Sequence, residues 1–171
     1  MQKIPLLIVF FALSVVTAMD VLGQNTGTSK LECSYWRSFV DPTMESREKW
    51  DSLSEEQALE GIQCYLAMKG EDKPSRFDFA NVGYHTSRRL PGPSIETAAL
   101  YYVSYIFFEN WNHAGAMTLV DKSGTASVKK LNRIAFRSYK AWFQNIRVIG
   151  LSEARKRKLN PLEGTGISWY S

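Results

Sequence analysis

The chain has 171 residues, 21 of them basic and 17 acidic, and a net charge of +4 is too small by itself to indicate nucleic-acid binding. Two cysteines and two histidines are too few for a zinc-rich module or a dense disulfide scaffold, and 13% aromatic residues exclude disorder throughout. The length fits one domain. We predict an all-α (mainly α) fold: a single-domain bundle of about five helices over residues 41–171, with one long irregular loop, after an N-terminal leader over 24–40.

The first residues have the features of an export signal. After Lys3, the segment 4–19 is almost entirely apolar, and about 16 residues are fewer than the roughly 20 that a membrane-spanning helix needs. Small residues around Ala18 and Gly23 offer two cleavage points. We therefore predict a signal peptide over 1–23 and a secreted or periplasmic protein with no membrane span after cleavage. The alternatives are an uncleaved anchor and a buried first helix.

Capping residues and apolar spacing predict the first helices. A short helix is expected over 43–53. Ser54 and Gln57 have the spacing of a capping box, so the next helix should begin there and stop near Gly70. The third helix, over 94–110, is apolar on all sides through its middle, which is typical of a helix at the centre of a core.

The later helices are expected over 113–120 and from Val128 to Gly150. Apolar residues of the longer one recur at spacings of three and four, so they should form its buried face: Val128, Leu131, Ala135, Tyr139, Trp142, Ile146 and Ile149. A short basic turn follows and stops at Asn160-Pro161. Strand patterns are weak, and 76–85 is the best place for a small hairpin. The tail 160–171 should fold back over the core, the alternative being an exposed docking peptide.

Charge is distributed unevenly along the chain. Residues 41–60 hold seven acidic and two basic residues, a net charge of −5, and residues 129–158 hold ten basic and one acidic, a net charge of +9. The two segments could be solvated faces that attract each other, or the basic one could bind an acidic partner. The candidate binding residues are Lys129, Lys130, Arg133 and Lys140. We expect a protein or an anionic envelope partner, and the export signal disfavours nucleic acid.

The segment 71–93 is longer than most connections in compact domains. It mixes basic and aromatic residues suited to binding anionic or polar groups, and the candidates are Arg76, Tyr84, His85, Arg88 and Arg89. The alternative is a structural loop that packs its apolar residues into the core.

Signals for catalysis are sparse. On a continuous helix Glu109 and His113 would share a face, as an acid/base or metal pair, although such a pair is more commonly a structural contact. No nucleophile elbow, zinc motif or phosphate-binding loop occurs, so we predict no catalytic residue, metal site or cofactor. The predicted function is that of an exported binding protein, inhibitor-like, immunity-like or envelope-associated. The alternative is an exported hydrolase or transferase with a site around Glu109 and His113.

The two cysteines are predicted to form one disulfide between Cys33 and Cys64. Their number is even, and the export signal places them in an oxidising compartment. On the predicted helix Cys64 lies off the stripe formed by Leu59, Ile62 and Leu66, so it is available to the segment that carries Cys33. The alternative is two free thiols.

Overall fold

The computed structural model describes residues 31–45, 52–77, 92–109 and 117–170. The predicted signal peptide lies outside them, as do most of the residues of the suggested hairpin. The elements are α1 (Cys33–Arg37), α2 (Glu55–Ala67), α3 (Ile95–Phe108), β1 (Leu119–Asp121), α4 (Val128–Ile149), α5 (Leu151–Lys156) and β2 (Ile167–Trp169). The described chain is therefore mainly helical with one small sheet, which confirms the predicted fold class.

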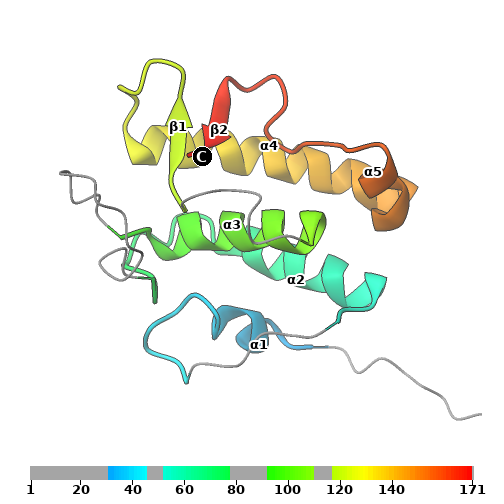
Figure 1. The fold of residues 1–171 in the computed structure, drawn as a ribbon. Helices are drawn as coiled ribbons and strands as arrows, with labels where there is room; N and C mark the ends of the chain where they lie inside the picture. Colours follow the sequence, from blue (N-terminus) through cyan, green and yellow to red (C-terminus); the bar gives the residue numbers. More distant parts are fainter. Residues whose placement is uncertain (1–30, 46–51, 78–91, 110–116, 171) are drawn as a thin grey trace, which may run out of the picture.

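Helix α3 lies at the centre of the molecule. Figure 1 shows α1 on one side of α2, then α3, and then α4 with the two strands and α5 on the opposite side. Of the 14 residues of α3, 12 are buried, because α2, α4 and α5 all contact it. The prediction of a central helix is confirmed. Its N-cap is Ser94, whose hydroxyl accepts a hydrogen bond from the backbone N–H of Thr97 at 3.3 Å.

Helix α2 begins as its capping signal predicts. The Ser54 hydroxyl accepts from the Gln57 backbone N–H, and the Gln57 side chain accepts from the Ser54 backbone N–H. The helix packs against α1 across a close approach, where the ring of Trp36 lies over Gly61. A Cβ atom at Gly61 would lie 2.9 Å from that ring, so a larger residue would push the two helices apart.

The disulfide between Cys33 and Cys64 is present and joins α1 to α2, with 5.3 Å between the two Cα atoms. Arg37 adds a polar link, since its guanidinium bonds the carboxylates of both Asp41 and Glu71. Helix α1 therefore belongs to the packed fold.

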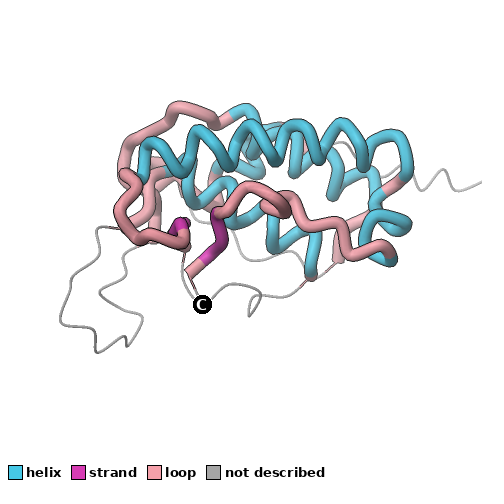
Figure 2. The backbone as a smooth tube through the Cα atoms, turned by 90° about the horizontal axis from the view of Figure 1, so that it is seen from above, coloured by secondary structure: helices cyan, strands magenta, loops and turns pink. Residues whose placement is uncertain are grey.

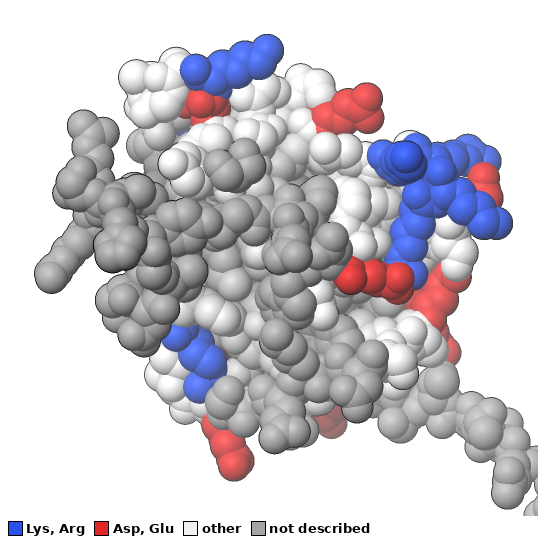
Figure 3. Space-filling view, in the orientation of Figure 1, with Lys and Arg blue, Asp and Glu red and all other residues white. Residues whose placement is uncertain are grey.

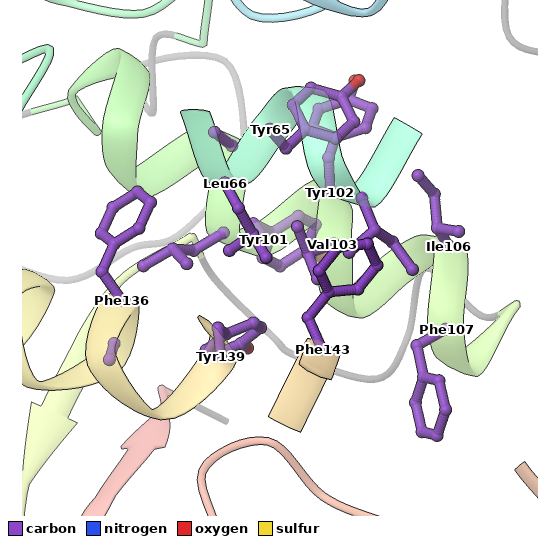
Figure 4. Packing of buried hydrophobic residues seen from close by; sticks show 14 of the residues in the cluster. Tyr65, Leu66, Tyr101, Tyr102, Val103, Ile106, Phe107, Phe136, Tyr139 and Phe143 are labelled. Carbon is purple, nitrogen blue, oxygen red and sulfur yellow. The ribbon is translucent and has the colours of Figure 1, made fainter. Parts of the chain in front are cut away.

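Helix α4 buries one face against α2, α3 and β1 (Figure 4). The buried residues are Leu131, Asn132, Ala135, Phe136, Tyr139, Trp142, Phe143 and Ile146. Most of the predicted stripe is confirmed, but it also includes Phe136 and Phe143. Val128 was expected in it and is 51% exposed, because the first turn of α4 extends past the core.

Two predicted helices differ from the structure. In the segment 43–53, residues 42–44 form a turn in which the Asp41 carboxylate accepts from the backbone and hydroxyl of Thr43, and residues 46–51 lie outside the described part. In the segment 113–120, the last residues belong to strand β1. Leu119 pairs with Trp169 of β2 in an antiparallel register. This strand was not predicted from the sequence because its partner lies fifty residues away along the chain, and a local pattern does not indicate such a distant pairing.

The C-terminal segment folds back over the core, as predicted. Trp169 is 8% exposed, and its indole Nε1–H donates to the hydroxyls of Ser104 and Tyr139, each at 3.1 Å. Those two hydroxyls are themselves 2.5 Å apart. One strand residue is thereby bonded to both α3 and α4. Among the described residues, no helix is both long and apolar enough to cross a membrane.

Candidate functional site: the basic face of α4

Helix α4 is the longest element described, with 22 residues and a length of about 33 Å. It begins after Ser127, whose hydroxyl accepts from the Lys130 backbone N–H, and ends at Gly150, where φ is +87°. In Figure 2 the helix runs along one edge of the molecule. Because its inner face is fixed in the core, its outer side chains are held on a rigid element.

Six basic residues make up the outer face, which we call the α4 basic face: Lys129, Lys130, Arg133, Arg137, Lys140 and Arg147. All six are exposed. At 100° per residue they fall within a sector about 100° wide. The four predicted candidates of this helix are thus brought together. Arg137 and Arg147 were not among those candidates, although the spacing of four residues between Arg133 and Arg137 was the signal that could have included Arg137.

The α4 basic face has no ionic partner within the described part of the chain. No acidic residue occurs between Val128 and Ser152. The ion pairs found there use Arg37, Arg155, Lys156 and Arg157 instead. Arg147 has a further contact, with its guanidinium 5.9 Å from the centre of the Phe143 ring. None of the acidic residues that the structure describes therefore pairs with the cations of this face.

The basic residues of α5 are in a different situation. Arg155 donates to the carbonyl oxygens of Phe107 at 2.9 Å and Ile106 at 2.8 Å, and its guanidinium lies 2.7 Å from the Glu109 carboxylate. It thus binds the free carbonyls at the end of α3. Figure 3 shows basic side chains gathered over α5 with acidic ones directly beside them.

Among the described residues, the acidic segment 41–60 is hydrogen-bonded to the basic segment at the junction of α4 and α5. The Glu55 carboxylate accepts from the Leu151 backbone N–H at 2.6 Å and from the Ser152 hydroxyl at 2.9 Å. These hydrogen bonds, the first above all, lower the pKa of Glu55. The contact uses the Leu151 backbone N–H and the Ser152 hydroxyl at the start of α5, so the Glu55 carboxylate is not paired with a cation of the α4 basic face.

The candidates of the long loop fall into two groups. Arg76 is half-buried, and its guanidinium donates to the backbone carbonyls of Asp41, at 2.7 Å, and Met44. It ties the segment after α2 to the segment after α1. Tyr84, His85, Arg88 and Arg89 lie outside the described residues.

The continuous helix that would place Glu109 and His113 on one face is not present. Helix α3 ends at Phe108, and Glu109 takes a left-handed conformation with φ of +54°. Residue His113 lies outside the described part of the chain. The Glu109 carboxylate forms an ion pair with Arg155, and this contact has a structural role at the end of α3.

A shallow hollow of about 480 Å³ lies beside the two strands. It is lined by Asp121, Lys122, Leu162, Gly164, Gly166, Ile167 and Ser168. The Asp121 carboxylate accepts from the Ser123 hydroxyl at 2.7 Å, which lowers its pKa. That bond belongs to the turn after β1. Within the described ranges, no three histidine, cysteine or acidic side chains cluster as metal ligands would.

Comparison with known protein families, with curated proteins and with solved structures finds no match to this chain.

Proposed function

We propose that this protein is an exported binding protein whose α4 basic face recognises an acidic macromolecular partner. The observation that carries the proposal is the set of six exposed cations on one rigid helix, with no acidic partner among the described residues. Charges of one sign on a fixed surface attract a partner of opposite sign and orient it during encounter.

Export is supported by two features that are separate in the sequence. The apolar run 4–19 after Lys3 is typical of a secretory signal, and the disulfide between Cys33 and Cys64 is of a kind that persists in oxidising compartments. N-terminal sequencing of the protein from its own cells should find a chain that begins after Ala18 or Gly23. Recovery of an intact Met1 form from the membrane fraction would contradict cleavage of the signal peptide.

The binding proposal is tested with two variants that have the same net charge. The first changes Lys129, Lys130, Arg133 and Lys140 to Glu. The matched control changes four exposed lysines outside α4 to Glu: Lys69, Lys73, Lys122 and Lys158.

Each protein is immobilised and exposed to an extract of its own cells. Retention of the partner by the wild type should fall as salt rises, because screening shortens charge interactions to about 8 Å at physiological ionic strength. The α4 variant should lose the partner and the control variant should keep it. Equal retention by both variants would show that the α4 basic face is only a solvated surface.

A further inference from the structure

We infer that the partner of the α4 basic face is a linear phosphate polymer without bases, of the poly(glycerol phosphate) type, lying along α4. This inference rests on the proposed function and narrows the partner to one chemical class. Three features of the face lead to it: the cations form a row, the row has no apolar centre, and it offers no aromatic surface.

The cations are arranged in a row along the helix axis. Lys129, Arg133, Arg137 and Lys140 follow one another at four, four and three residues, which corresponds to rises of about 6, 6 and 4.5 Å. Arg147 extends the row to about 27 Å. A compact anion could reach two or three of these groups, whereas a flexible chain of regularly spaced anions can place a charge opposite each of them. Guanidinium groups such as those of Arg133 and Arg137 also match phosphate oxygens in pairs.

The face lacks the centre that a protein partner would need. Stable protein interfaces bury apolar or aromatic anchors near their middle and surround them with polar groups. On α4 the large apolar side chains that are mostly exposed are Val128 and Val148, which stand at the two ends of the helix. Between them the exposed residues are cations, Gln144, Asn145 and the small Ala141. On this face the apolar residues are at the ends and the polar residues are in the middle, which is the reverse of a protein interface with an apolar core.

The face also lacks a surface on which bases could stack. Proteins that bind single-stranded nucleic acid combine a positive groove with aromatic side chains that stack on the bases. The four aromatic residues of α4 are Phe136, Tyr139, Trp142 and Phe143, and all of them are buried. Recognition on this face is therefore limited to charge and to hydrogen bonds with backbone anions.

The row of cations destabilises helix α4 when nothing is bound to it. A bound polyanion would remove this unfavourable electrostatic energy. Lys129 and Lys130 lie in the first turn, where the partial positive charge of the helix N-terminus disfavours cations. Lys129 and Arg133, and likewise Arg133 and Arg137, are like charges four residues apart, which repel each other. Phosphates along the row would neutralise both effects together.

The test measures binding of a poly(glycerol phosphate) chain, long enough to span the row, to the wild type and to the two charge-reversed variants. The slope of log affinity against log salt is about −0.7 per contact for a flexible strand, so six contacts predict a loss of about 300-fold from about 50 to 200 mM salt. The α4 variant should lose binding and the control variant should keep it. Melting curves confirm that both variants are folded.

Three other outcomes would overturn the inference, each with a different meaning. If the wild type ignores the polymer but still retains its native partner through the α4 basic face, the partner is of another class and the proposed function stands. If the two variants lose the native partner equally, the proposed function fails as well. Tighter binding of a single-stranded oligonucleotide with the same number of phosphates would show that bases are recognised.

Discussion

The outer face of α4 and the short helix α5 hold the same residue types but use them differently. Arg155 of α5 bonds two carbonyl oxygens at the end of α3 and pairs with Glu109. Arg157 and Lys156 pair with Glu153 one turn away. The six cations of α4 have no such acceptors among the described residues. A count of charges along the chain treats the two regions as one basic segment, and the position of acceptors separates them.

The difference has a geometric cause. Helix α5 follows directly after Gly150 and contacts α3, so Arg155 reaches carbonyls that α3 leaves free. The outer face of α4 turns away from α2, α3 and β1, which all contact its inner face. Arg155 is therefore bonded within the fold, whereas the cations on the outer face of α4 have no acidic partner among the described residues.

The largest expected loss of stability comes from a substitution on the inner face of α4. Trp142 is 8% exposed, packs edge-on against Phe107 with ring centres 4.8 Å apart, and donates to the Leu159 carbonyl at 3.1 Å. Trp142→Ala should lower the free energy of unfolding by about 3–5 kcal/mol, because truncation leaves a cavity and an unpaired carbonyl. Urea unfolding measures this loss. A change below about 1 kcal/mol would mean that the site is not part of the core.

The next largest change in the free energy of unfolding is expected for Arg155, which is bonded within the fold, in comparison with the exposed Arg137. Arg155→Ala should cost about 1.5–3 kcal/mol, since hydrogen bonds to a charged group are lost at the end of α3. Arg137→Ala, on the α4 basic face, should stay within about 0.5 kcal/mol of the wild type. Both are measured by urea unfolding. Equal losses would erase the distinction between the two basic regions.

Acid unfolding tests the ion pair between Arg37, the last residue of α1, and Asp41. Hydrogen bonds from the Thr43 side chain and backbone, together with Arg37, lower the pKa of Asp41 to about 2. The charged form is favoured in the folded state, so Asp41 stabilises the fold above its ordinary pKa and this contribution is lost as pH falls from about 4 towards 2. Asp41→Asn should therefore flatten the pH dependence of stability in that window. The exposed Glu163→Gln, which removes the same charge, is the control.

The smallest expected effect is an increase in the free energy of unfolding. Lys129→Glu should raise the free energy of unfolding by about 0.5–1 kcal/mol, because a carboxylate suits the first turn of α4 and pairs with Arg133 four residues on. The same variant should bind the partner more weakly. A gain in stability together with a loss of binding would separate function from folding on this face. A destabilised variant would mean that Lys129 has a structural role.

Several features of the fold followed from local patterns. The capping box at Ser54, the apolar middle of α3 and the stripe of α4 each depend on residues three or four apart, and each helix is present. The disulfide followed from the even number of cysteines and their expected compartment. The cations of α4 could also be placed together from their spacing, although Val128 was wrongly included in the buried stripe.

The amino-acid sequence by itself determined the helices α2, α3 and α4, which face of α4 is apolar and that its other face is basic. Only the tertiary structure decided that Leu119–Asp121 is a strand, since its partner Ile167–Trp169 comes from the far end of the chain. It also decided which cations are used inside the molecule. Helical periodicity is a short-range property, whereas strand pairing and ion pairing depend on residues that are distant in sequence and close in space, such as Arg155 and the carbonyl of Phe107.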